Sequence, residues 1–224
     1  MGGVLIVISI VVPTLLWTDL TNAFVWLASL STIAFAAIGF IDDYRKVIHE
    51  RNLGLTARAK LGLQILVSVL IAAALIAMQT KGMYSTKLVV PFLKQFRPTL
   101  VIERFVHSPE LWPVAFLPFV TFVVIVFVGS SNVVNLTDGL DGLAIGCTVI
   151  AAGALTVLTY VSGHATFAAY LELQPMPQVG ELTIFCGAMV GAALGFLWYN
   201  AHPAEVFMGD VGSLALGGAI GTVA

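Results

Sequence analysis

The sequence predicts an all-α protein that crosses a membrane as a polytopic bundle of helices. Hydrophobic residues fill 59% of its 224 positions and charged residues only 10%, and the mean hydropathy is +1.00. Soluble globular domains contain roughly 25% charged residues, so most of this chain is expected to contact lipid. Backbone polar groups in lipid must be paired internally, and the apolar runs are too long and continuous for barrel strands. Helices are therefore the predicted spanning elements.

Seven apolar stretches are long enough, or nearly so, to cross a hydrocarbon core of about 30 Å as helices. They cover residues 4–20, 23–41, 61–78, 112–129, 143–162, 182–199 and 206–224. The chain starts directly in one stretch and ends inside another, without a cap or a basic flank. We therefore expect residues 1–224 to form a single transmembrane domain, truncated at both ends.

Alternation of seven spans sorts the connecting segments onto two faces of the membrane. The first face receives residues 1–3, 42–60, 130–142 and 200–210, and the second receives 19–22, 79–111 and 163–181. Each face carries five Lys and Arg residues, so the positive-inside rule only weakly favours a cytoplasmic first face, whose basic residues share the shorter loop. No Lys or Arg follows Arg104, which argues against nucleic-acid binding.

Two further patterns predict packing. Cys147 and Cys186 lie in apolar runs without a second Cys or a His at metal-ligand spacing, so both are predicted to be small buried hydrophobic residues. Gly187, Gly191 and Gly195 repeat every four residues. That spacing suits close packing between helices within the chain, which we favour, or the interface of a homodimer.

Acids and amides from three connecting segments gather on the first face. They are Asp42 and Asp43, then Asn132, Asn135, Asp138 and Asp141, then Asn200 and Asp210. If residues 132–141 are helical, the second set recurs every three residues along one side. Asp42 and Lys46, four residues apart, would share a helix face. Hard oxygen ligands without a Cys or His cluster favour Mg²⁺, which takes one or two carboxylates together with substrate phosphate oxygens.

Each acid also has a purely structural interpretation. Asp138, Asp141 and Asp210 precede apolar helices, where Asp is a favoured N-cap. Asp42 and Asp43 could mark a helix end at the water boundary. Acids at a helix C-terminus oppose the macrodipole, however, so their placement favours a functional role.

Three strings resemble one enzyme family. They are Asp42–Lys46 (DDYRK), Asn135–Ala144 (NLTDGLDGLA), and Phe196–Asn200 (FLWYN) followed by Pro203–Leu214 (PAEVFMGDVGSL). They resemble the phospho-N-acetylmuramoyl-pentapeptide transferases, bacterial translocases that make the first lipid intermediate of peptidoglycan. The first two strings also suit the wider polyprenyl-phosphate sugar-1-phosphate transferase superfamily, whereas the last is more specific. The resemblance covers essentially the whole chain.

The resemblance implies a ten-helix enzyme of the bacterial inner (plasma) membrane with its active site facing the cytoplasm. Such an enzyme transfers phospho-N-acetylmuramoyl-pentapeptide from UDP to undecaprenyl phosphate, releases UMP and uses Mg²⁺. Asp210 matches the metal-binding catalytic aspartate, and Asp42 and Asp43 match the paired catalytic aspartates that handle the lipid phosphate. The matched substrate-binding positions are Lys46 and Lys60 of one cytoplasmic loop, and Asn135, Asp138, Asp141, Asn200 and Phe207 around the nucleotide. By the same match, Phe207 would stack on uracil.

Two departures and two rival functions accompany this resemblance. The family's segment before Met-Gly-Gly and its histidine-rich loop are missing from this sequence, so an incomplete nucleotide pocket is expected. A related transferase that uses UDP-N-acetylglucosamine and the same lipid carrier would share the aspartates. A proton-coupled transporter would need charged or His side chains near the bilayer midplane, and residues 23–41, 143–162 and 182–199 contain none.

Overall fold

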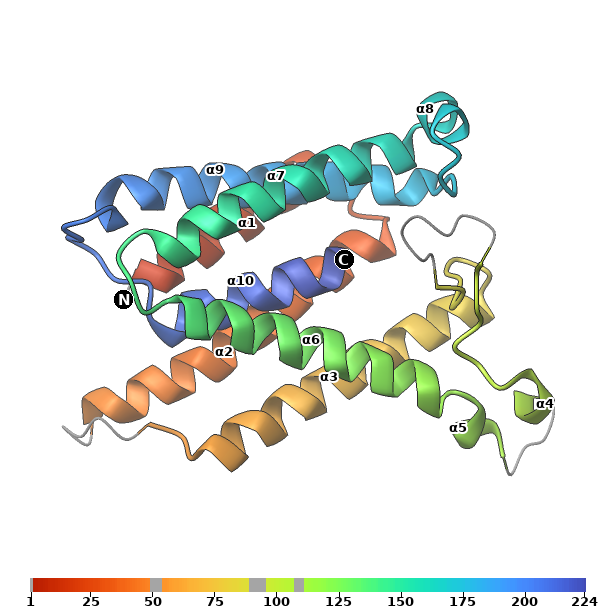
Figure 1. The fold of residues 1–224 in the computed structure, drawn as a ribbon, viewed down its shortest axis with the longest axis horizontal. Helices are drawn as coiled ribbons and strands as arrows, with labels where there is room; N and C mark the ends of the chain where they lie inside the picture. The colour runs from red at the N-terminus through yellow and green to blue at the C-terminus, as the bar shows by residue number, and fades with distance from the viewer. Residues whose placement is uncertain (1, 49–53, 89–95, 107–110) are drawn as a thin grey trace.

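The computed structural model describes residues 2–48, 54–88, 96–106 and 111–224. Within them, seven helices of 15 to 26 residues run lengthwise through the molecule (Figure 1). They are α1 (Gly2–Trp17), α2 (Ala23–Ile48), α3 (Ala57–Thr80), α6 (Leu117–Thr137), α7 (Leu143–Gly163), α9 (Leu182–Asn200) and α10 (Gly209–Val223). The connections contain α4 (Glu103–Val106), α5 (Trp112–Ala115), α8 (Ala165–Tyr170) and the 3₁₀ helix η1 (Pro177–Glu181). The described residues contain no strand, which confirms the all-α prediction.

Among the described residues, five helices are long and apolar enough to cross a membrane. They are α2, α3, α6, α7, and α9 together with η1. At 1.5 Å per residue, the 16 residues of α1 and the 15 residues of α10 extend about 24 and 22 Å, less than a full hydrocarbon core. Each of the seven predicted stretches therefore contains a helix, and five of these helices have the length of a complete span.

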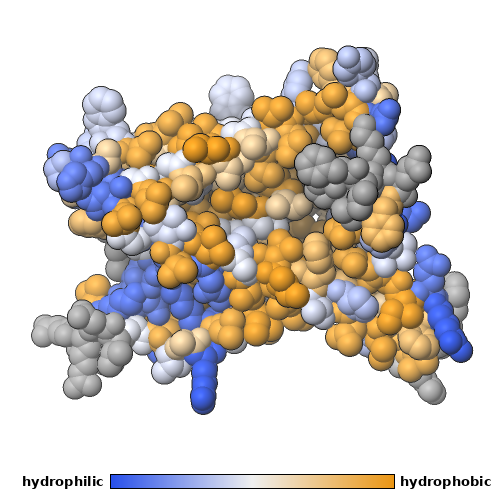
Figure 2. Space-filling view, in the orientation of Figure 1, coloured by the Kyte–Doolittle hydropathy of each residue, from blue (hydrophilic) through white to orange (hydrophobic). Residues whose placement is uncertain are grey.

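Large apolar side chains project outward from the bundle. Leu16 is 73% exposed, Leu70 is 61% exposed and Ile150 is 76% exposed. Figure 2 shows hydrophobic residues over the middle of one face of the molecule. Such a surface is unfavourable in water and suited to hydrocarbon. The chain is therefore a multi-pass membrane protein.

The connections alternate between the two ends of the bundle (Figure 1). At the end that holds the start of α1, the Gly142 N–H donates to Asn200 Oδ1 at 3.2 Å and links the α6–α7 turn to the end of α9. At the opposite end, Asn22 Nδ2 donates to the Gln178 carbonyl at 2.7 Å and links the α1–α2 turn to η1. These two ends correspond to the two membrane faces that alternation predicted.

Helix α10 is the most enclosed element of the bundle. Its residues from Val211 to Ala219 are all buried, and it packs most extensively against α2 and α6. A Cβ atom added at Gly39 of α2 would collide with the backbone carbonyl of Asp210. Small residues permit this close approach of two helices in a membrane. The approach places the end of α2, with its two aspartates, beside the start of α10.

Two packing predictions are wrong. A Cβ atom added at Gly187, Gly191 or Gly195 would meet no atom within 4 Å among the described residues, so these glycines do not mediate close packing within the bundle. Cys186 is buried as predicted, but Cys147 is exposed. Both errors have the same reason: in a membrane protein a small or apolar residue is equally stable against a helix or against lipid, so residue type does not reveal which face is covered.

The tight α2–α10 contact generates the first prediction. Gly39→Ala should lower the free energy of unfolding of the full-length protein by about 1–3 kcal/mol, as expected for overpacking. Gly62 on α3 is the matched control, because a Cβ there meets no atom of the described part of the chain within 4 Å. Gly62→Ala should be neutral or stabilise by up to about 1 kcal/mol through helix propensity. Denaturant or thermal unfolding in detergent checks both, and equal shifts of the same sign would contradict the contact.

Candidate functional site

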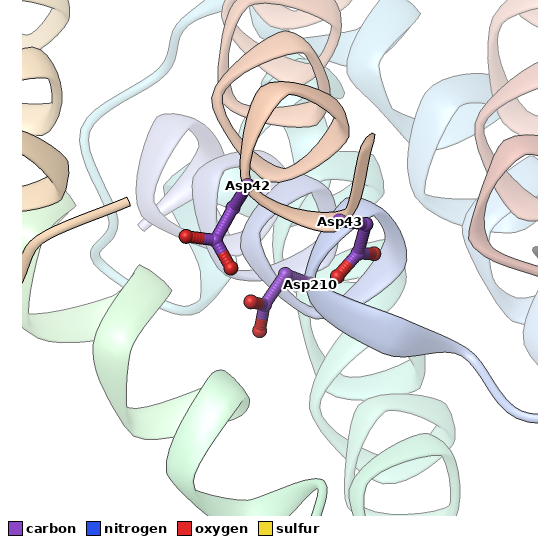
Figure 3. Close-up of side chains that lie close together, drawn as sticks. All are labelled: Asp42, Asp43 and Asp210. Carbon is purple, nitrogen blue, oxygen red and sulfur yellow. The ribbon is translucent and has the colours of Figure 1, made fainter. Parts of the chain in front are cut away.

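Three aspartates from two helices converge at one end of the bundle (Figure 3). Asp42 and Asp43 lie near the end of α2, and Asp210 is the second residue of α10. One carboxylate oxygen from each residue lies within 4.8 Å of the others. Asp42 is only 3% exposed. Because like charges this close repel each other, the cluster requires neighbouring positive charge.

Helix α2 continues further than the sequence predicted, and this brings Lys46 into the cluster. The loop was expected to begin at residue 42, but α2 ends at Ile48. Lys46 therefore lies one helical turn beyond Asp42, with its Nζ 2.6 Å from Asp42 Oδ2. The predicted shared face of these two residues is confirmed. A lysine in the last turn also interacts favourably with the negative end of the helix dipole.

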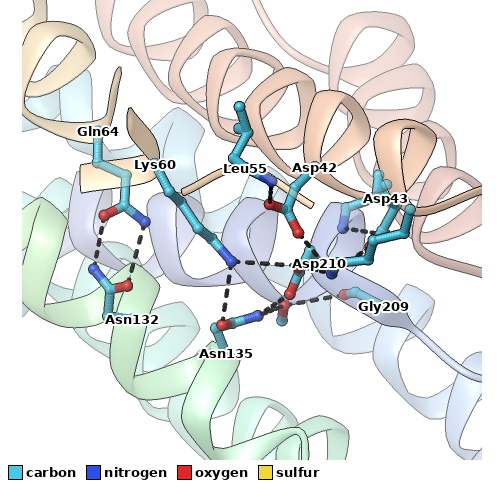
Figure 4. Close-up of polar contacts among 12 residues, drawn as sticks. Asp42, Asp43, Leu55, Lys60, Gln64, Asn132, Asn135, Gly209 and Asp210 are labelled. Atoms are coloured by element: carbon cyan, nitrogen blue, oxygen red, sulfur yellow. Dashed lines mark hydrogen bonds and ion pairs between the residues drawn. The ribbon is translucent and has the colours of Figure 1, made fainter. Parts of the chain in front are cut away.

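Two lysines neutralise most of the cluster's negative charge (Figure 4). Lys46 Nζ lies 3.3 Å from Asp43 Oδ1 and 2.5 Å from Asp210 Oδ2, so it contacts all three carboxylates. Lys60 Nζ lies 3.3 Å from the same oxygen of Asp210. Lys60 belongs to the first turn of α3, so the two lysines sit on helices that flank the connection rather than in the loop predicted for both. Three carboxylates and two ammonium groups leave one net negative charge.

Asn135 of α6 binds the opposite side of Asp210. Its Nδ2 donates to Asp210 Oδ1 at 2.5 Å and to Ser213 Oγ at 2.8 Å. Ser213 in turn donates to the Gly209 carbonyl at 3.0 Å. Sequence analysis did not select Ser213, although its spacing of three residues from Asp210 on a helix was an available signal. These contacts hold the Asp210 carboxylate between α2, α3 and α6.

Asp43 contacts the N-terminus of α10. The Val211 N–H donates to Asp43 Oδ2 at 3.3 Å, where the exposed N–H groups of a helix favour negative charge. Gly209 has a φ of +68°, and a Cβ there would lie 2.8 Å from Asp43 Oδ2. Asp42 is held separately, since the Leu55 N–H donates to its Oδ1 at 2.7 Å. Backbone N–H groups thus orient both aspartates of α2.

The capping interpretation is wrong for Asp138, Asp141 and Asp210. Met208 occupies the N-cap position of α10, and Asp210 lies inside the helix. Helix α6 ends at Thr137, so Asp138 follows it as the C-cap residue, and Gly142 precedes α7. The same ending shows that residues 132–141 are not one helix. Only Asn132 and Asn135 of that predicted row lie on α6.

Asp138 lies within electrostatic range of the cluster. Burial raises the pKa of Asp138 to about 6, and the negative charges of Asp210 and Asp43 add to the effect. A carboxyl group with a pKa close to neutral pH can exchange a proton under working conditions. Asp138 therefore differs chemically from an ordinary surface aspartate.

The other predicted site residues form a second group around the α9–α10 connection. Asn200 is 4% exposed, and its Nδ2 donates to the Val206 carbonyl at 2.9 Å. Asp141 accepts the Ala204 N–H at 3.1 Å and contacts His202 Nδ1 at 3.2 Å. These hydrogen bonds, first that of Ala204, lower the pKa of Asp141. The Phe207 side chain is 66% exposed, so its ring is available at the surface.

The arrangement suits phosphate and divalent-cation chemistry. Carboxylate oxygens are the ligands that hard cations such as Mg²⁺ prefer, and lysine ammonium groups bind phosphate as point charges. Figure 2 shows a hydrophilic patch toward the left end of the molecule, over the neighbouring ends of α2, α6 and α10. The site is therefore located where the bundle meets the polar boundary of the membrane.

Comparison with known proteins gives consistent matches. The chain is 73% identical over all 224 residues to a phospho-N-acetylmuramoyl-pentapeptide-transferase of Koribacter versatilis. It is 71% identical to the protein of that name from Acidobacterium capsulatum and 58% identical to that from Solibacter usitatus. The chain spans 59% of the length of each of these relatives. These relatives confirm the resemblance carried by the three strings.

The family assignment rests on a match that covers most of the described helices. The model of glycosyl transferase family 4 matches residues 25–224, a range that includes all three aspartates and both lysines of the cluster. The chain belongs to glycosyl transferase family 4.

Proposed function

We propose that the full-length protein transfers phospho-N-acetylmuramoyl-pentapeptide from UDP to undecaprenyl phosphate, releasing UMP and forming the first lipid intermediate of peptidoglycan synthesis. The observation that carries this proposal is the convergence of Asp42, Asp43 and Asp210 with Lys46 and Lys60 at one end of a membrane bundle. A lipid phosphate and a water-soluble nucleotide can meet only at such a boundary. The names of the similar proteins support the same reaction.

The proposal includes Mg²⁺ as a cofactor, because the residues of the cluster fit it. Three carboxylates each offer an oxygen within 4.8 Å of the others, and the ammonium group of Lys46 already lies among them, so the donor set accommodates positive charge. Asp210 would be the main ligand, with Asp42 and Asp43 beside it. Bound Mg²⁺ would supply positive charge that stabilises phosphate oxygens during transfer.

The residues of the chain would act by positioning and by neutralising charge. In the reaction, an oxygen of the lipid phosphate forms a bond to the sugar-linked phosphorus, and the bond from that phosphorus to the bridging oxygen breaks. Negative charge develops on the departing UMP, which Lys46 and Lys60 would offset. A phosphate monoester has a second pKa of about 6, so it attacks without a strong base. Asp42 and Asp43 would therefore orient the acceptor rather than deprotonate it.

The second group of residues would bind the nucleotide. Asn200 and Asp141 hold the α6–α7 turn against the α9–α10 connection, and the exposed ring of Phe207 lies on that connection. Aromatic stacking on a base contributes about 1–3 kcal/mol in other proteins. Asn135, which binds Asp210, and Asp138, which lies near the cluster, would complete the substrate contacts.

Substrate preference tests the proposal directly. Membranes that contain the full-length protein should release UMP from UDP-N-acetylmuramoyl-pentapeptide when undecaprenyl phosphate is supplied. UDP-N-acetylglucosamine should be turned over at least about a hundredfold more slowly, because contacts to the missing lactyl-peptide group would be lost. Product analysis by mass spectrometry measures both. Faster turnover of UDP-N-acetylglucosamine would favour the related transferase that shares the aspartates.

Removing the charge of Asp210 tests the metal assignment. Asp210→Asn should lower kcat by about a hundredfold or more, because it weakens a hard-cation site while keeping the side chain's shape. Raised Mg²⁺ should partly restore the rate. Asp19→Asn, at the opposite end of the bundle, is the matched control and should leave the rate unchanged. Activity of Asp210→Asn within a few-fold of wild type at low Mg²⁺ would remove Asp210 from the catalytic residues.

We also propose that the cluster faces the cytoplasm, because UDP-sugars are made there. The test uses Asn52→Cys and Val90→Cys, at positions outside the described residues, in the full-length protein without its other cysteines. A membrane-impermeant maleimide should label position 90 in intact cells and position 52 only after permeabilisation. Labelling of both positions from the same side would contradict the alternation of spans.

A further inference from the structure

Gln64 carries a polar amide into the interior of the bundle. It lies one helical turn beyond Lys60 on α3, and its side chain is fully buried, with 0% exposure. A buried amide destabilises a protein unless it is hydrogen-bonded, and polar side chains are rare within apolar helices of membrane proteins. The hydrogen-bond partner of Gln64 therefore indicates the structural role of this side chain.

The partner of Gln64 is Asn132 on α6 (Figure 4). Asn132 Nδ2 donates to Gln64 Oε1 at 2.8 Å, and Gln64 Nε2 lies 3.5 Å from Asn132 Oδ1. Asn132 Nδ2 also donates to the Val128 carbonyl of its own helix at 2.7 Å. This second bond fixes the orientation of the Asn132 amide. The Gln64–Asn132 pair is therefore directional in a way that apolar contacts between α3 and α6 are not.

A second polar pair joins the same two helices at the aspartate cluster. Lys60 Nζ lies 3.5 Å from Asn135 Oδ1, and both residues also contact Asp210. Gln64 lies four residues after Lys60, and Asn132 lies three residues before Asn135. Residues three or four apart share a helix face, so the two pairs lie one turn apart along the α3–α6 contact. One pair binds the cluster and the other lies deeper in the bundle.

The rotation of α3 about its axis decides whether Lys60 reaches Asp210. Successive residues of a helix differ by about 100° in direction, so a small rotation moves Lys60 away from the cluster. The far side of α3 gives little resistance, because Leu66 and Leu70 there are 55% and 61% exposed. The reciprocal amide bonds at Gln64 oppose this rotation.

We propose that Gln64 is a positioning residue: by pairing with Asn132, it holds Lys60 and Asn135 in contact with Asp210. Gln64 does not touch the reacting groups itself. The proposal deepens the proposed function and rests on it wherever transfer activity is the measurement.

An exchange of the two amides tests the pairing. Gln64→Asn or Asn132→Gln alone changes the combined length of the pair by one methylene group and should lower kcat of the full-length enzyme about tenfold. The double variant restores the combined length and should recover to within about threefold of wild type. Ser68→Ala, the matched control, removes a buried hydroxyl one turn further along α3 that bonds only the Gln64 backbone carbonyl among the described residues, and should keep wild-type activity. A double variant no better than the worse single variant would overturn the proposal.

A measurement independent of activity follows Lys60 itself. The Lys60 side chain is 17% exposed and that of Lys46 is 36% exposed. In the purified full-length protein, Gln64→Leu should raise the rate at which a water-soluble amine-acylating reagent modifies Lys60 by about fivefold, with Lys46 unchanged, as read by mass spectrometry. Unchanged acylation of Lys60 in a folded Gln64→Leu protein would overturn the proposal.

The two measurements separate the positioning role from the proposed reaction. If wild-type protein transfers nothing, the proposed function fails, while increased acylation of Lys60 in Gln64→Leu still supports positioning. If wild-type protein is active and Gln64→Leu retains both full activity and slow acylation, the positioning role fails alone. If Gln64→Leu does not fold, the activities of Gln64→Asn, Asn132→Gln and the double variant test the positioning role instead.

Discussion

The site depends on keeping three carboxylates together at the end of a membrane bundle. Asp42, Asp43 and Asp210 lie close enough to repel each other strongly, and each is wholly or partly buried. Lys46 contacts all three, and the N-terminus of α10 offers an N–H group to Asp43. Without these compensating charges, the aspartates would separate or take up protons. Because the carboxylates and ammonium groups of this cluster nearly cancel in charge, the cluster is suited to binding a divalent cation together with the negative charge of a phosphate group.

The packing of the helices serves this arrangement. The close approach of α2 and α10 at Gly39 brings together aspartates that lie far apart in the sequence. Helix α6 then approaches α10 from another side and supplies Asn135, while α3 supplies Lys60. Four helices thus each contribute polar groups to one point. Helices α2, α3 and α6 also carry exposed apolar side chains, such as Leu30, Leu70 and Ile125, whereas α10 is enclosed by its neighbours. The Gln64–Asn132 pair adds a further polar contact between α3 and α6, one helical turn deeper in the bundle.

The two groups of site residues have different structural characters. The aspartate cluster is formed by side chains of helices, whose positions are fixed by packing. The second group belongs to the short α6–α7 turn and the α9–α10 connection, which are joined by the hydrogen bonds of Asn200 and Asp141. In the proposed transfer, the aspartate cluster would hold the phosphate groups, and the adjacent connection, which exposes Phe207, would bind the base of the nucleotide. The chain spans 59% of the length of the similar protein from Koribacter versatilis.

The sequence alone determined the fold class, the positions of the seven helices and the face on which the acids gather, because these follow from hydropathy and from alternation across a membrane. The resemblance carried by its strings also indicated the family and predicted ten site residues. Six of the ten meet in one cluster: Asp42, Asp43, Lys46, Lys60, Asn135 and Asp210. Only the tertiary structure decided that α2 extends past its apolar run, that Asp210 binds Asn135 instead of capping its helix, and that Gln64 pairs with Asn132. Each of these outcomes depends on contacts between helices far apart in the sequence, and a local pattern carries no information about which helices will meet.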